Sequence, residues 1–129
     1  MQVPNDRRYT EAHEWAKPGD DGATVRIGIT DFAQDALGDI VSVDLSDPGA
    51  VFSVGDTVAE VESTKSVGEI YAPIAGTVVS VNEALAETPE LDNSDPYGDG
   101  WFMELAIGDP AAIDGLLDAA GYQALTESA

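Results

Sequence analysis

The sequence predicts a mainly β fold: a sandwich or flattened barrel of two sheets, with short flanking helices and a C-terminal helix. Segments that alternate apolar and polar residues recur along the chain, as in half-buried strands, and clusters of Gly, Pro and Asp separate them. One strand pattern also occurs twice, as GDIVSVD at residues 38–44 and GTVVSVN at residues 76–82. This repeat suggests two similar sheets related by an approximate two-fold axis.

The chain has 129 residues and 43% hydrophobic residues, so we expect one domain over residues 1–129 with a core of its own. Turn residues lie near positions 47–49, 55–56 and 72–76. Between these turns the period-two pattern predicts five strands, at Val25–Ile29, Val41–Leu45, Val58–Glu62, Val79–Val81 and Trp101–Ile107.

The first helix is expected to begin after Asp31, which can act as its N-cap. Gln34 completes a capping-box pattern three residues later, and Gly38 follows the expected end of the helix. The residues of this helix that we expect to face the core are Phe32, Ala36 and Leu37.

Two further helices are expected in the second half of the chain. Asn82 can cap a brief helix that ends before Pro89. Asp109 and Pro110 are typical of the first turn of another helix, which we expect to end at Gly121. Its expected apolar stripe is Ile113, Leu116, Leu117 and Ala120.

The charge is strongly acidic: 25 Asp and Glu residues against five Lys and Arg residues give a net charge of -20. This charge argues against nucleic-acid and membrane partners, because phosphate backbones and anionic lipids would be repelled. The absence of cysteine excludes disulfides, thiol nucleophiles and zinc sites built on cysteine. No membrane-length apolar run and no signal-peptide core are present, so we expect a cytoplasmic protein. The many negative charges repel one another, and only high salt would screen this repulsion. The composition therefore indicates an organism that lives at high salt.

Lys65 is the only basic residue after position 26, in a stretch with twenty acidic residues. Residues 59–73 read as a β-hairpin with Lys65 at or near its tip, the side-chain stem in solvent. One interpretation is that Lys65 neutralises Glu62 and Glu69, although exposed ion pairs contribute only about 0–1 kcal/mol. The other is that the reachable amine is a site of covalent modification.

Other candidate residues point to structural roles. His13 has no Cys or second His nearby and is expected to be a packed or capping residue rather than a base. Trp15 and Trp101 are expected at the core or its rim. A group of side chains resembles a calcium loop, but the twelfth position is Met103 and a proline interrupts the spacing. We therefore expect an acidic surface loop at Asp92, Asn93, Asp95 and Asp99.

Several blocks of the sequence resemble the glycine cleavage system H protein. Residues 9–15 read YTEAHEW, residues 27–41 read IGITDFAQDALGDIV, and residues 62–65 read ESTK. YAP at residues 71–73 and a late block, NSDPYGDGW at residues 93–101, follow in the family's order. The resemblance covers nearly the whole chain and implies the fold of lipoyl and biotinyl carriers, the barrel-sandwich hybrid.

The resemblance implies a non-catalytic carrier with lipoic acid joined to Lys65. Its partners would be glycine decarboxylase (P protein), which uses pyridoxal phosphate, the folate-dependent aminomethyltransferase (T protein), and dihydrolipoyl dehydrogenase (L protein). A lipoate ligase or transferase would attach the group. The resemblance also implies that Glu14 and Glu69 contact the aminomethyl-loaded arm. The chain departs from commoner members at Ala36 and at residues 66–68.

The sequence leaves four alternatives open. A biotin carrier usually places its lysine between methionines, whereas the neighbours here are Thr64 and Ser66. The lipoyl module of a 2-oxoacid dehydrogenase is shorter and lacks the first two blocks. An H-like protein that relays lipoyl groups to other acceptors would share all of these features, and a plain acidic binding domain would have no prosthetic group. We find no set of residues suited to independent catalysis.

Overall fold

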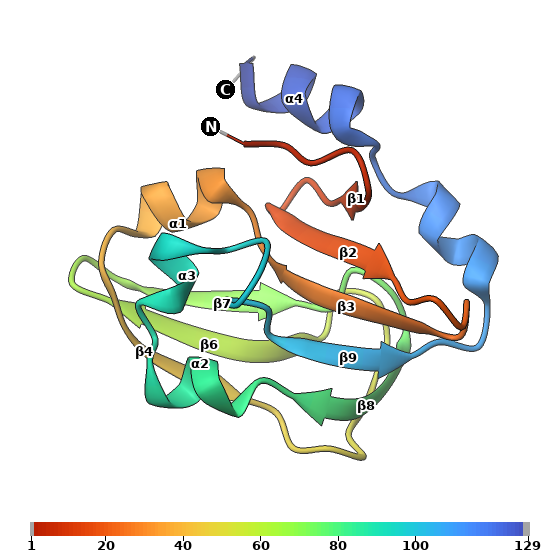
Figure 1. Ribbon diagram of the computed structural model, residues 1–129, viewed down its shortest axis with the longest axis horizontal. Coiled ribbons are helices and arrows are strands. Elements are labelled where there is room, and N and C mark those ends of the chain that lie inside the picture. The colour runs from red at the N-terminus through yellow and green to blue at the C-terminus, as the bar shows by residue number, and fades with distance from the viewer. Residues whose placement is uncertain (1, 128–129) are drawn as a thin grey trace.

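The computed structural model describes residues 2–127 and consists mainly of two antiparallel sheets (Figure 1). The six-stranded sheet has the order β1-β2-β3-β9-β8-β5, and the three-stranded sheet has the order β4-β6-β7. The strands are β1 (Arg8–Tyr9), β2 (Glu14–Pro18), β3 (Thr24–Ile29), β4 (Ile40–Leu45), β5 (Val51–Phe52), β6 (Thr57–Ser63), β7 (Val67–Tyr71), β8 (Gly76–Val81) and β9 (Met103–Ala106).

Short helices flank the sheets: α1 (Asp31–Leu37), α2 (Glu83–Glu87), α3 (Leu91–Ser94), the 3-10 helix η1 (Pro110–Gly115) and α4 (Ala119–Glu127). Helices α1 and α3 lie beside each other near the turn between β6 and β7 (Figure 1). The mainly β two-sheet prediction is therefore confirmed, and all five expected strands are present. The two copies of the repeated pattern form β4 and β8, which lie in different sheets.

The main core lies between the sheets and consists of the inward-facing residues of their strands. Alternation along β3 buries Val25, Ile27 and Ile29, and β6 contributes Val58 and Val61. A second cluster of Tyr9, Trp15 and Tyr122 joins the N-terminal strands to α4. The stacked rings of Tyr9 and Tyr122 lie 4.7 Å apart, so aromatic packing anchors α4 to the rest of the molecule.

Helix α1 has a different cap and a different buried face from those expected. Thr30, not Asp31, is the N-cap, and its hydroxyl accepts a hydrogen bond from the Ala33 amide. The side chain of Asp31 instead accepts a bond from Gln34. Ala36 is exposed rather than core-facing, because the turns of the helix that meet the sheets carry Ala33 and Leu37. Gly38 ends the helix at a φ of 81°, as predicted.

The C-terminal helix predicted over residues 109–121 is wrong in its extent. Asp109 does cap a helix, but η1 ends at Gly115 and the chain continues in extended form. Leu117 then forms a β-bridge with Tyr9 through two backbone hydrogen bonds of 2.8 and 2.9 Å. This non-local pairing interrupts the helical stripe, and Gly121 lies inside α4 instead of ending a helix.

The expected acidic surface loop is only partly at the surface. Asp95 and Asp99 are exposed, whereas Asn93 is half-buried and Asp92 is fully buried in α3. Asp92 faces inward because α3 packs its first turn against the body of the protein. No group of three or more His, Asp or Glu side chains within residues 2–127 is arranged to hold a metal ion. None of the described helices is long and apolar enough to cross a membrane.

Candidate functional site

Lys65 lies on the exposed turn that joins β6 to β7, as the hairpin pattern predicts. Ser63 orders this turn. Its hydroxyl accepts hydrogen bonds from the amides of Lys65 and Ser66 at 3.2 and 3.1 Å, and its own amide donates to the Ser66 carbonyl at 2.8 Å. The turn therefore presents the lysine from a defined backbone conformation rather than from a loose loop.

The Lys65 ammonium group forms no ion pair within the described part of the chain, so Glu62 and Glu69 do not neutralise it directly. Its stem is not wholly in solvent, contrary to expectation. A Cβ atom placed on Gly38 would lie 3.2 Å from Lys65 Cε and 3.4 Å from Cδ, so the stem lies over Gly38 at the end of α1. The amine itself stays accessible.

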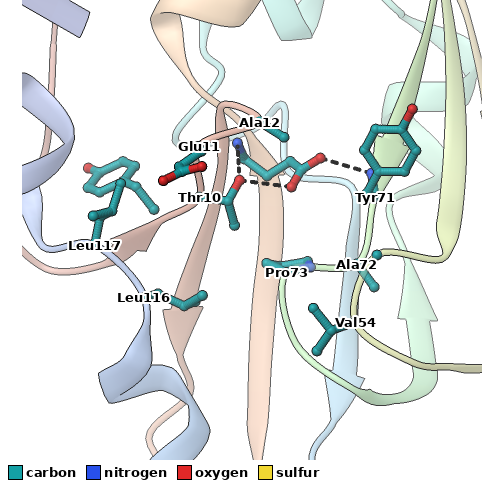
Figure 2. Close-up of a pocket in the computed structure, with 12 residues that line it drawn as sticks. Thr10, Glu11, Ala12, Val54, Tyr71, Ala72, Pro73, Leu116 and Leu117 are labelled. Atoms are coloured by element: carbon teal, nitrogen blue, oxygen red, sulfur yellow. Dashed lines mark hydrogen bonds between the residues drawn. The ribbon is translucent and has the colours of Figure 1, made fainter. Parts of the chain in front are cut away.

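Glu14 lies at the start of β2 and is only 3% exposed. Oε1 accepts a hydrogen bond from the Thr10 hydroxyl, and Oε2 accepts one from the Tyr71 backbone amide, both at 2.9 Å (Figure 2). Burial raises the pKa of Glu14, and these two hydrogen bonds oppose the rise. Two bonds leave further lone pairs on the carboxylate free to accept from a ligand cation.

Glu14 contributes to the wall of a pocket of about 470 Å³. The pocket is mostly apolar, and its lining comes from four distant parts of the chain (Figure 2). The lining residues are Tyr9, Thr10, Glu11, Ala12, Glu14, Val54, Gly55, Tyr71, Ala72, Pro73, Leu116 and Leu117. A carboxylate in such a wall suits a ligand with an apolar body and a cationic end.

Glu69 lies on the exposed face of β7 and is not part of the pocket lining. It accepts a hydrogen bond from the Tyr71 hydroxyl at 3.2 Å, whereas Glu14 accepts from the Tyr71 amide. The structure thus brings both carboxylates to Tyr71, at one end of β7, and places Lys65 beyond the other end. The five residues of β7 span four steps of about 3.3 Å, so its ends lie about 13 Å apart and a long attachment on Lys65 would be needed to bridge them.

Sequence reasoning missed the groups that hold Glu14. Thr10 precedes Glu14 by only four residues, and this short spacing could have indicated the hydrogen bond between them. The backbone amide of Tyr71 leaves no such pattern in the sequence. Leu116 and Leu117 were expected in the apolar stripe of a helix, but they follow η1 in extended chain. Both pack against the hydrophobic clusters and also line the pocket. His13 is packed, as predicted: its ring stacks on Phe32 at 4.3 Å.

Comparisons with known proteins show which family the chain resembles. The family model described as "Glycine cleavage H-protein" matches residues 7–129. The glycine cleavage system H protein of a Thermus thermophilus strain is 56% identical over 128 residues, covering 99% of this chain and 98% of that protein. That of Nocardia farcinica is also 56% identical, covering 94% of each chain.

Similarity extends to solved structures. The crystal structure of a glycine cleavage system H protein from Mycobacterium marinum superposes with a TM-score of 0.84 at 40% identity, covering 97% of this chain and 99% of that one. The family match, the close relatives and the shared fold lead to one conclusion: the chain belongs to the glycine cleavage H-protein family.

Proposed function

We propose that Lys65 is the residue to which lipoic acid is joined, so that the chain acts as the lipoyl carrier of the glycine cleavage system. The single observation that carries this assignment is the exposed, unpaired amine on an ordered hairpin turn. The other lysine, Lys17, lies within β2 and forms an ion pair with Asp6 at 3.5 Å. Only Lys65 therefore combines access with freedom from a partner among the described residues.

Proteins of this family are carriers and not enzymes, and they work with the P, T and L proteins of the glycine cleavage system. Lipoate, once attached through an amide, supplies a disulfide that accepts the aminomethyl group and is later restored by oxidation. The chain itself contributes an accessible attachment point, an ordered turn, and a sheltered pocket wall. The residues present fit the group, because the pocket offers apolar surface and one carboxylate to a long arm with a cationic end.

The attachment site can be tested by intact-mass measurement after incubation with lipoate, ATP and a lipoate ligase. The wild type should gain one lipoyl group, and Lys65→Arg should gain none. Lys17→Arg is the matched control, since it removes the other lysine and should still be modified fully. Full modification of Lys65→Arg, or an unmodified wild type with an active ligase, would contradict the assignment.

We further propose that Glu14 binds the aminomethyl amine of the loaded arm, with Glu69 as a second acidic contact. Support comes from the position of Glu14 in an apolar wall, where water competes poorly and a charge-assisted bond is strong. Glu69 lies outside the pocket, on the side from which an arm attached at Lys65 would approach along β7.

The Glu14 role predicts a shorter lifetime of the aminomethyl adduct in Glu14→Gln, because the amide cannot neutralise a cation. Loss of one charge-assisted bond corresponds to roughly a tenfold faster release. Glu11→Gln is the control, since Glu11 lines the same pocket but is exposed. The lifetime can be followed by mass spectrometry of the loaded protein; equal lifetimes in wild type and Glu14→Gln would refute the role.

Two finer proposals concern the source organism and the cellular location of the protein. The excess of acidic residues supports an origin in a salt-rich cell, since high salt screens the repulsion among their charges. We propose that the protein acts in the cytoplasm, because the relatives are bacterial glycine cleavage proteins.

A further inference from the structure

We propose that Asn93 is a positioning residue for the modification of Lys65, because its amide holds the loop on which the lysine-bearing turn is seated. This inference rests on the proposed function, in which Lys65 accepts lipoate. It gives a role to Asn93, the first residue of the late block at residues 93–101, to which the carrier function assigns none. Residues 38–40, which connect α1 to β4, are called the seat loop below.

Asn93 holds the seat loop from both sides. Its Nδ2 atom donates to the Gly38 carbonyl at 2.9 Å, and its Oδ1 atom accepts from the Ile40 amide at 2.9 Å. The same Nδ2 donates to Gln34 Oε1 at 3.0 Å, which ties the middle of α1 to α3. The residue between the two clamped positions, Asp39, therefore has a fixed backbone.

The seat loop in turn contacts the lysine-bearing turn at two points. The carbonyl of Asp39 accepts a hydrogen bond from the Thr64 amide at 3.0 Å, one residue before Lys65. The stem of Lys65 lies over Gly38, where any side chain would crowd it at 3.2 Å. One amide side chain thus controls both the backbone and the side-chain support of the lysine.

The internal bonds of the turn do not replace this support. Ser63 orders the turn from within, through its bonds to the amides of Lys65 and Ser66. Those bonds fix the shape of the turn but not its position relative to the rest of the protein. The β4–β6 ladder holds the hairpin as far as the Ile40–Ser63 pair, and the Thr64 to Asp39 bond extends this hold into the turn itself. The seat loop therefore sets the last backbone contact before the amine that a modifying enzyme must find.

An aspartate at position 93 would keep the size of the side chain but lose both N–H donors. The carbonyl of Gly38 and Oε1 of Gln34 would then face a negative charge instead of a donor. The seat loop should shift away from the charge, and the Thr64 to Asp39 bond should weaken. Small displacements of a reacting group are costly, on the order of tenfold or more in rate.

The experiment measures kcat and KM for lipoylation of the purified protein by a lipoate ligase, using intact mass at several acceptor concentrations. Asn93→Asp should lower kcat/KM by about tenfold. Amide hydrogen exchange should become faster at Thr64 but not at Val61, in the buried part of β6. Asn82→Asp is the matched control, because Asn82 also donates to two loop carbonyls, those of Asp99 and Trp101, away from the lysine.

A merely structural role for Asn93 predicts that both variants lose thermal stability and modification efficiency alike, with no selective change at Thr64. That outcome overturns the inference, as does wild-type kcat/KM in folded Asn93→Asp. Should Asn93→Asp not fold, Gly38→Ala disturbs the seat loop directly, because it strains the positive-φ backbone at Gly38 and puts a methyl group against the Lys65 stem. Wild-type lipoylation efficiency of Gly38→Ala would show that the seat loop does not position Lys65. A wild-type protein that takes no lipoate at Lys65 rejects the proposed function itself, which is a distinguishable result.

Discussion

Asp92 is a fully buried carboxylic acid, and neither of its oxygens has a hydrogen-bond partner among the described residues. Burial without compensation raises the pKa of Asp92 well above its ordinary value. Glu14 is also buried, but two donors support its charged form and oppose the rise. The same side-chain chemistry therefore has a proposed binding role at Glu14 and a stability cost at Asp92.

Asp92→Asn should be more stable than the wild type at neutral pH by roughly 1–3 kcal/mol, because an uncompensated buried acid is removed. Below the unfolded pKa of about 3.8, Asp92 is protonated in both states and the ionisation cost is absent. As the pH rises above that value, the unfolded state ionises first, and the wild type loses free energy of unfolding relative to the variant.

Urea unfolding of both proteins between pH 4 and pH 8 measures this difference. The difference in free energy of unfolding between Asp92→Asn and the wild type should widen with pH. It should level off above the raised pKa of Asp92 in the folded state. Glu90→Gln, an exposed carboxyl two residues earlier, should show no such widening. A pH-independent gap for Asp92→Asn would show that ionisation of Asp92 is not the cause.

At the level of elements, the exposed face of the three-stranded sheet carries a row of three carboxylates. Asp44 pairs with Glu60 across β4 and β6, and Glu60 pairs with Glu69 across β6 and β7. All three side chains are exposed. Like charges in directly opposite cross-strand positions destabilise a sheet, so Glu60 repels both neighbours.

Glu60→Lys should stabilise the protein at low ionic strength by roughly 0.2–1 kcal/mol, since it exchanges two repulsions for two attractions. The gain should shrink in about 1 M salt, where the screening length is only about 3 Å. Thermal unfolding in both buffers provides the measurement. Glu83→Lys, on the first turn of α2, is the control for adding a positive charge elsewhere. An equal effect of both substitutions on stability would argue against specific repulsion within the row of carboxylates.

At the level of the whole molecule, the net charge of -20 should make stability depend on salt. We expect Tm to rise markedly between dilute buffer and molar KCl, with one cooperative transition if residues 1–129 form one domain. Sucrose is the control, because it favours compact states without screening charge. Equal Tm values in both salt conditions would contradict the proposed salt-rich origin.

Local sequence patterns were sufficient for the features that depend on neighbouring residues. Alternation of apolar and polar residues placed the five expected strands, because the side-chain period of a strand is local. The hairpin that exposes Lys65 followed from two such strands around a short polar turn, and Gly38 ended α1 because its backbone requires a positive φ. The blocks around these elements also carried the family resemblance.

Features that depend on residues far apart in the chain emerged only in three dimensions. The bridge between Tyr9 and Leu117 interrupted a helix that local spacing favoured, and the pocket beside Glu14 formed from segments up to about a hundred residues apart. The burial of Asp92 and the hold of Asn93 on the seat loop arise in the same way. Hydrogen bonding and desolvation depend on which groups meet in space, and local periodicity does not encode those meetings.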